Sequence, residues 1–185
     1  MHISKKNLVR ILVSFVIVIV IIGLWLVKNH GAENIAELDG QGSVAKAPTN
    51  PDFALDVTEP LDLDRLKSYG LPILLDFGAD SCAPCKEMAP ILKDLNARLQ
   101  GKAIIRFIDV WKYPELANGF PIRVIPTQMF FDMEGKPYVP SDPSDSQLLM
   151  YIHKDTEEHL FTAHEGGMTE AMIMEALGEM GLHND

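Results

Sequence analysis

The chain has 185 residues, a formal net charge of −10 and two cysteines. Its acidic residues all lie beyond residue 30, where 12 basic and 26 acidic residues leave a net charge of −14. Nucleic acid and anionic lipid repel a surface of that charge, so the composition excludes nucleic acid as a partner.

The N-terminal residues 1–28 predict a cytoplasmic N-terminus followed by a transmembrane anchor. Lys5, Lys6 and Arg10 precede or begin an apolar stretch over 8–27, and 20 residues of helix span about 30 Å, the thickness of a bilayer's hydrocarbon core. A cleaved signal peptide is the alternative, but the apolar run is longer than usual and no suitable small-x-small cleavage site follows. The basic residues before the run predict that the rest of the chain is extracytoplasmic, and a cleaved signal would give the same compartment.

Two further parts follow the predicted anchor. Residues 29–52 are small and polar with scattered glycine and proline, which predicts a flexible linker with a reach on the order of 25 Å. Residues 53–185 are enough for one domain with its own core.

The first elements of this domain are a helix and a buried strand. We expect the helix between Thr58, as its N-cap, and Gly70, which ends it. The next segment, 72–77, is almost continuously apolar, which predicts a strand buried on both faces. Its one polar residue is Asp76, and a carboxyl group buried without a partner would hold its proton tightly enough to act as a base near neutral pH.

The remaining pattern predicts an α/β domain with helices on both faces of a mixed sheet. The expected elements, in chain order, are a long helix over 84–101 with Pro90 inside it, a buried strand over 103–110, a short helix over 113–120, a strand from 126 into a turn at 134–135, a hairpin over 148–167 that turns at 155–157, and a last helix capped by Thr169. His153, His159 and His164 lie on the hairpin, where we expect solvated side chains rather than metal ligands.

The two cysteines, Cys82 and Cys85, are three positions apart. A disulfide that closes so short a loop contributes only about 2 kcal/mol of chain-entropy stabilisation, so the spacing favours a redox function over a structural one. Cys82 is expected at the edge of the long helix, where unpaired N–H groups and the helix dipole favour the thiolate. Pro84 suits the first turn of that helix. Cys85, one turn further, is expected to be the less accessible, resolving thiol.

The stretch "ILLDFGADSCAPCKEMAPIL", followed by "VIPTQMFF", resembles the thioredoxin family, and the resemblance covers roughly 61–182. It implies a thioredoxin-like three-layer sandwich, with Cys82 as nucleophile, Cys85 as resolving cysteine and Asp76 as the carboxylate that accepts the resolving thiol's proton. The resemblance also implies a substrate-binding surface, formed by Ala83, Pro84, Ile125, a cis Pro126 and Gly166. It implies no metal and no cofactor other than the redox-active disulfide.

The sequence also departs from the family pattern. Gly78 and Ser81 stand where tryptophan is usual, and residues 137–157 read as an insertion between the last two strands. The implied activity is reduction of disulfides in extracytoplasmic proteins, with a membrane electron carrier as donor. A disulfide oxidase or isomerase of the same fold, and a C-x-x-C metal-handling module, are the alternatives at this stage.

Overall fold

The structure is a computed structural model that describes residues 50–142 and 147–183. The predicted anchor over 1–28 and nearly all of the predicted linker over 29–52 lie outside these ranges. Between residues 50 and 183, no helix that the structure describes is long and apolar enough to cross a membrane.

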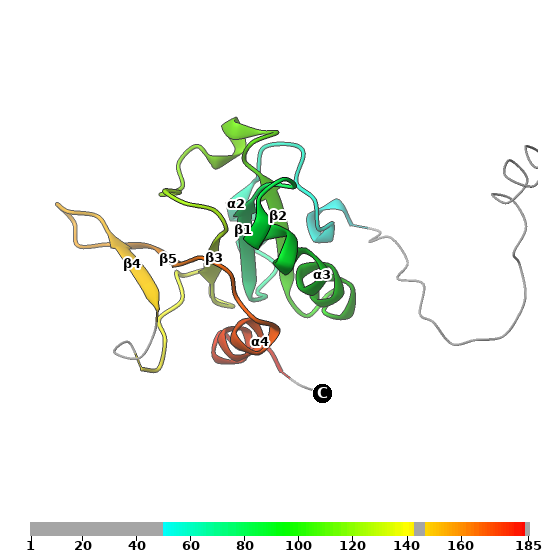
Figure 1. Ribbon diagram of the computed structural model, residues 1–185. Coiled ribbons are helices and arrows are strands. Elements are labelled where there is room, and N and C mark those ends of the chain that lie inside the picture. The colour runs from blue at the N-terminus through cyan, green and yellow to red at the C-terminus, as the bar shows by residue number, and fades with distance from the viewer. Residues whose placement is uncertain (1–49, 143–146, 184–185) are drawn as a thin grey trace, which may run out of the picture. The chain divides into compact units, whose positions relative to one another are not determined.

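Helices and strands alternate along the first part of the domain, and three successive strands precede the last helix (Figure 1). In chain order they are η1 (Pro51–Phe53), α2 (Leu63–Lys67), β1 (Ile73–Gly78), α3 (Ala83–Arg98), β2 (Ile104–Asp109), η2 (Pro114–Ala117), β3 (Thr127–Phe131), β4 (Leu148–Ile152), β5 (His159–Glu165) and α4 (Glu170–Glu179). The predicted order of elements is therefore confirmed.

The five strands form one mixed sheet in the order β2-β1-β3-β5-β4. The β1–β2 pair is parallel and the other pairs are antiparallel. The register places Asp76 of β1 opposite Gln128 of β3, and Gln128 opposite His164 of β5. These three residues therefore form one row across the middle of the sheet.

Helices cover both faces of the sheet, which confirms the expected three layers. Under α3 and α4 the core contains residues from every second position of β1, β2 and β3, among them Leu74, Ile105 and Phe130. The opposite face packs against α2 and η2 through the intervening positions, including Ile73, Leu75, Phe77, Met129 and Phe131. This alternation follows from the two-residue period of a strand.

Helix α2 begins later than the sequence predicts. The Asp62 side chain, not Thr58, caps it by accepting a 3.0 Å hydrogen bond from the Arg65 N–H. The delay has a non-local cause, because the residues just before Thr58 pair with β2: the Val57 N–H donates to the Phe107 carbonyl over 2.9 Å. At α4 the predicted cap is confirmed, since the Thr169 side chain accepts from the Met172 N–H.

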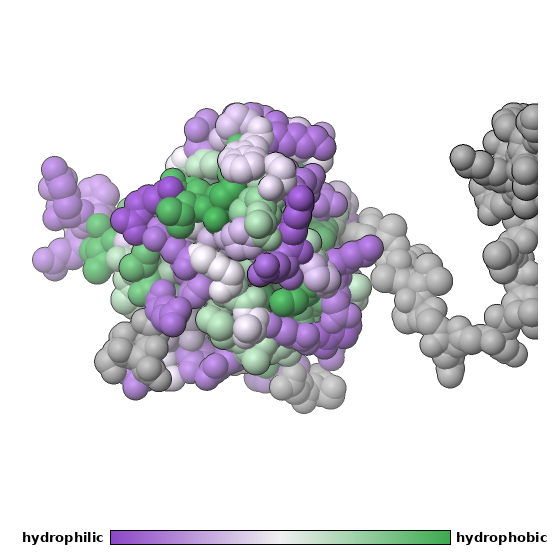
Figure 2. All heavy atoms as spheres, viewed as in Figure 1, coloured by the Kyte–Doolittle hydropathy of each residue, from purple (hydrophilic) through white to green (hydrophobic). Residues whose placement is uncertain are grey.

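The predicted hairpin is present as β4 and β5, and β4 forms an outer edge of the sheet (Figure 1). Its turn is closed by the His153 N–H, which donates to the Glu158 carbonyl over 2.7 Å. The turn is hydrophilic, and hydrophobic residues lie next to it on the hairpin surface (Figure 2). These include the exposed side chains of Leu149, Met150 and Ile152 on β4.

The candidate redox site

Cys82 and Cys85 form a disulfide at the start of α3, with their Cα atoms 5.3 Å apart. Cys82 is the N-cap residue and Pro84 lies in the first turn, as the sequence predicts. The first N–H groups of an α-helix have no partner within the helix, and they favour negative charge beside them. When the disulfide is reduced, this position therefore stabilises a thiolate at Cys82.

The two cysteines differ less in exposure than expected. Cys82 is 8% exposed and Cys85 is 4% exposed, so the nucleophile is also largely covered. Ala79 and Ile125 pack against the pair. Ala83 and Pro84, which separate the two cysteines in the chain, are exposed, so a partner would first meet these two residues.

The segment before β3 lies next to the disulfide, beside Cys82. The Ile125–Pro126 peptide bond is cis, as predicted, and the Ile125 carbonyl oxygen lies 4.0 Å from the Cys82 Sγ. The Gly166 N–H donates to the Pro126 carbonyl over 2.8 Å, in a backbone conformation with φ of +105°. The structure thus brings Ile125, Pro126 and Gly166 together beside Cys82.

Gly78, at the end of β1, lies directly beneath α3. A Cβ atom at this position would lie 2.9 Å from the Phe107 ring and 3.2 Å from the Cys85 Sγ. The absence of a side chain therefore permits the close approach of Cys85 to the sheet. Asp76 is two residues earlier on the same face of β1, which corresponds to about 7 Å along the strand.

Asp76 is buried, with 1% of its surface exposed. Its Oδ1 accepts a 2.7 Å hydrogen bond from the Gln128 Nε2, and its Oδ2 has no hydrogen-bond partner among the described residues. Burial raises the pKa of Asp76 to about 7, and the Gln128 hydrogen bond opposes that rise. The carboxyl group can therefore gain and lose a proton near neutral pH.

Gln128 and His164 extend this polar contact across the sheet, and the sequence reasoning did not assign either to the site. The Gln128 Oε1 lies 3.0 Å from the His164 Nδ1, and both side chains are buried. A signal for Gln128 exists in the sequence, because it is a polar residue within the apolar strand "TQMFF", just as Asp76 is within "PILLDF".

The expectation that His164 is solvated is wrong. His164 is 3% exposed, because β4 pairs on the outer side of β5 and α4 covers this face. Burial lowers the pKa of His164, so its ring is neutral at neutral pH. His153 is exposed and His159 is half-buried.

Asp109, at the end of β2, holds the active-site loop. Its carboxylate accepts backbone N–H groups of Asp80, Trp111 and Lys112, each over 3.0 Å. Burial works to raise the pKa of Asp109, but these donors hold it below its ordinary value. The carboxylate thus ties the loop before Cys82 to the loop after β2.

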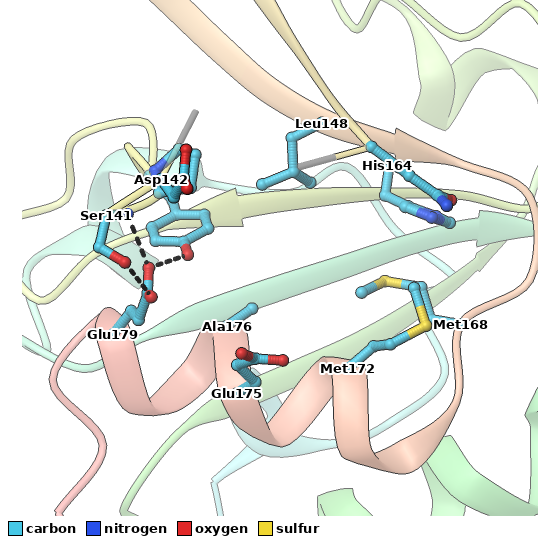
Figure 3. Close-up of a pocket in the computed structure, with 12 residues that line it drawn as sticks. Ser141, Asp142, Leu148, His164, Met168, Met172, Glu175, Ala176 and Glu179 are labelled. Atoms are coloured by element: carbon cyan, nitrogen blue, oxygen red, sulfur yellow. Dashed lines mark hydrogen bonds between the residues drawn. The ribbon is translucent and has the colours of Figure 1, made fainter. Parts of the chain in front are cut away.

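A cavity of about 300 Å³ lies between the sheet and α4, and Figure 3 shows His164 at one end and Glu179 at the other. Glu179 accepts hydrogen bonds from the Tyr138 hydroxyl and from Ser141. Apolar side chains of Leu148, Met168 and Met172 line the space between. In the part of the chain that the structure describes, no three histidine, cysteine or carboxylate side chains are grouped as metal ligands.

Comparison with known proteins identifies the family. The thioredoxin family profile matches residues 64–154. Thioredoxin 1 of Chlorobaculum tepidum is 37% identical over 68 residues, which cover 37% of this chain and 67% of that protein. Thioredoxin of Rickettsia felis is 38% identical over 79 residues, which cover 43% of this chain and 75% of that protein.

A third relative is much longer than the matched region. The bifunctional thioredoxin reductase/thioredoxin of Mycobacterium leprae is 27% identical over 118 residues. The match covers 58% of this chain but about a quarter of that protein, 26%. On the shared sequence, this chain belongs to the thioredoxin family, and Cys82 and Cys85 are its cysteine pair.

Proposed function

We propose that the chain reduces disulfide bonds of extracytoplasmic proteins, with Cys82 as nucleophile, Cys85 as resolving thiol and Asp76 as base. The observation that carries the proposal is the position of Cys82 at the first turn of α3, with Cys85 one turn further and the Asp76 carboxyl group buried beneath. Each of these groups has the environment that its step in thiol–disulfide exchange requires.

The reaction begins with the reduced pair. The Cys82 thiolate attacks one sulfur of a substrate disulfide, the substrate S–S bond breaks, and one substrate thiolate leaves while a mixed disulfide with Cys82 forms. Cys85 then loses its proton to Asp76, whose buried carboxyl group lies on the same face of β1 as Gly78 beneath Cys85. The Cys85 thiolate attacks the Cys82 sulfur, which releases the second substrate thiolate and forms the Cys82–Cys85 disulfide. Two electrons have then passed to the substrate.

The residues around Cys82 bind the substrate. Ala83 and Pro84 are exposed, and the Ile125 carbonyl beside the Cys82 Sγ is positioned to accept a backbone N–H from an extended substrate segment. The Gly166 backbone borders the same edge and has no side chain to obstruct it. The net negative charge of the chain favours substrates without strong acidic character.

The location is proposed from the sequence. The apolar run over 8–27 and the basic residues before it support a single-pass anchor with the redox domain on the extracytoplasmic side. A reductase in that compartment must itself be reduced, so we assign a membrane electron carrier with a dithiol as its donor. Protease accessibility of the domain in sealed membrane vesicles tests the orientation.

Insulin reduction, driven by dithiothreitol, tests the catalytic assignment with the full-length chain. We expect Cys82→Ser to reduce the rate to that of the uncatalysed reaction, whereas Ser81→Ala, one residue away, changes the rate less than twofold. We expect Cys85→Ser to trap substrates as mixed disulfides on Cys82. Full activity of Cys82→Ser would overturn the proposal. The redox midpoint separates the reductase from an oxidase, since about −270 mV favours reduction and about −120 mV favours oxidation.

A further inference from the structure

Asp76, Gln128 and His164 form a buried row of contacts that crosses three strands beneath α3 and α4. They are register neighbours on β1, β3 and β5, and none is more than 3% exposed. The contacts run from the Asp76 Oδ1 to the Gln128 Nε2 over 2.7 Å, and from the Gln128 Oε1 to the His164 Nδ1 over 3.0 Å. The mechanism above uses only the first of the three residues.

Every polar atom of the Gln128 side chain has a partner. Its amide nitrogen donates to the Asp76 Oδ1 and lies 3.5 Å from the Met88 Sδ, which serves its second N–H group. Its carbonyl oxygen is an acceptor only, so the His164 Nδ1 must carry the proton that it receives. Since the imidazole is neutral, its Nε2 then has no proton, and this buried atom has no hydrogen-bond partner among the described residues.

The orientation of the Gln128 amide decides which form of Asp76 it stabilises. With the N–H group toward Asp76, the amide donates to a carboxylate and favours its ionised form. Rotated by 180°, the amide would present its carbonyl oxygen, which repels a carboxylate and accepts a hydrogen bond from the protonated acid. A proton on the His164 Nδ1 is compatible only with the first orientation.

We infer that Gln128 and His164 are positioning residues for the Asp76 base: the Nδ1–H of His164 fixes the Gln128 amide, so that its N–H group faces the carboxylate. This inference rests on the proposed role of Asp76 in resolution. The arrangement keeps a buried carboxyl group able to release its proton between turnovers. Without it, Asp76 would stay protonated and could not accept the proton of Cys85.

Few other titratable groups face this row. From α3, Cys85 lies over the same face, and Met88 covers Gln128 without a charge. Within β1 and β3, no other titratable side chain points to this face. The cavity next to His164 is lined by Tyr138 and by the acids Asp142, Glu175 and Glu179. At His164 burial lowers the pKa, and a backbone hydrogen bond at Gly166 opposes that shift.

Titration of Asp76 in the oxidised full-length chain, followed by NMR of ¹³Cγ-labelled aspartate, tests the arrangement without any catalytic step. We expect Gln128→Leu to raise the Asp76 midpoint by about one pH unit, a tenfold gain in proton affinity. The reason is that this variant loses the Gln128 hydrogen bond, the only one that the described residues make to the Asp76 carboxyl group. We expect His164→Leu to raise it by about half a unit. His164→Asn, whose amide N–H can replace the Nδ1–H, should restore the original midpoint.

Met129→Leu is the matched control, because Met129 follows Gln128 on the opposite face of β3, and it should leave the titration unchanged. A folded Gln128→Leu protein with an unaltered midpoint would refute the inference. Should that variant not fold, equal midpoints in His164→Leu and His164→Asn would refute it as well. The role of Asp76 as a base is tested separately by the rate at which the Asp76→Asn variant resolves a mixed disulfide. If the pH profile of that rate equals that of the unsubstituted chain, the proposed function of Asp76 is refuted, whatever the NMR titration gives.

Discussion

The two faces of the sheet have the same architecture but different chemistry. On β1, the residues that face α2 are Ile73, Leu75 and Phe77, all fully buried and apolar. Under α3 the same strand presents Leu74, Asp76 and Gly78. The apolar face contributes hydrophobic burial, whereas the other face gives up part of that contribution to place a carboxyl group and a glycine under the cysteines.

This difference shows that the polar residues of the site are confined to one row and are not spread through the core. Asp76, Gln128 and His164 are joined by hydrogen bonds across three strands, and most of their neighbours are apolar. The α2 face carries a charge on the edge strand β2, where the Arg106 side chain donates a hydrogen bond to the Asp52 carbonyl over 2.7 Å. Substitutions on the two faces should therefore differ in sign and in pH dependence.

The largest expected effect is on the apolar face. Phe77→Ala removes a fully buried ring whose centroid lies 4.8 Å from that of Phe120. We expect it to lower the free energy of unfolding by about 3–5 kcal/mol. Since the hydrophobic cluster around Phe77 contains no acidic side chain and no histidine, urea unfolding should give the same loss at pH 5 and pH 8. A loss of unfolding free energy that varied strongly with pH would contradict the proposed difference between the two faces.

The neighbouring residue on the other face should give the opposite sign. Burial raises the pKa of Asp76 to about 7 in the folded state from an ordinary value of 3.8, so its favourable contribution is complete below pH 3.8 and is lost as the pH rises through 7. Asp76→Asn removes this loss. We expect a gain of about 3–4 kcal/mol in unfolding free energy at pH 8, which falls toward zero near pH 4.

Unfolding curves of Asp76→Asn at several pH values between 4 and 8 measure this dependence. A matched control is Asp80→Asn, in the loop before Cys82, whose side chain is exposed, so the substitution should change the unfolding free energy by less than about 0.5 kcal/mol. Equal stability of Asp76→Asn and the unsubstituted chain at pH 8 would mean that the carboxyl group is hydrated in solution.

Much of this contrast could be predicted from local sequence. Asp76 interrupts an apolar run, and the cysteine spacing with Pro84 indicates a helix start, so the strand, the helix and the first catalytic residues follow from short-range patterns. Gln128 is an equally visible interruption. The partners of Gln128 cannot be inferred from the local sequence, because they depend on a register between strands that are more than 30 residues apart.

The errors also have non-local causes. Alternation on the hairpin predicts that His164 is solvated, but β4 and α4 together bury it, and no pattern within β5 indicates which face they cover. Thr58 has the composition of an N-cap, yet pairing of the preceding residues with β2 delays the helix. Cys82 is less exposed than its helix position suggests, because the distant Ile125 packs against it.

Asp109 lies at the end of the sheet rather than on either face, and we expect an intermediate effect there. Asp109→Ala leaves three backbone N–H groups without their acceptor, which should cost about 1–3 kcal/mol at pH 7. Because the folded-state pKa of Asp109 is depressed, its contribution is complete above the ordinary value near 4 and is lost as the pH falls through the folded-state pKa.

The difference between Asp109→Ala and the unsubstituted chain should therefore shrink as the pH falls below 4, the reverse of the trend at Asp76. Thermal unfolding from pH 3 to pH 7 measures it. Asp109→Asn, which keeps one acceptor oxygen, should lose less than Asp109→Ala. If the two variants were equally destabilised, the loop would be held by contacts other than these hydrogen bonds.

The smallest effects concern the helices that cover the two faces. Asp62 caps α2 over the apolar face and Thr169 caps α4 over the polar face, each through one hydrogen bond from its side-chain oxygen to a backbone N–H. Replacement of either by alanine should cost about 1 kcal/mol in unfolding free energy. Thr58→Ala is the control, since the structure leaves Thr58 outside the helix and its loss should change stability by less than about 0.5 kcal/mol.

Only Thr169→Ala should also alter the Asp76 titration, because α4 covers His164, whereas α2 lies on the face that has no contact with the row. Should Asp62→Ala shift that titration as much as Thr169→Ala, the two faces would be coupled through the sheet, and the chemistry of the polar row would not be separable from the packing behind it.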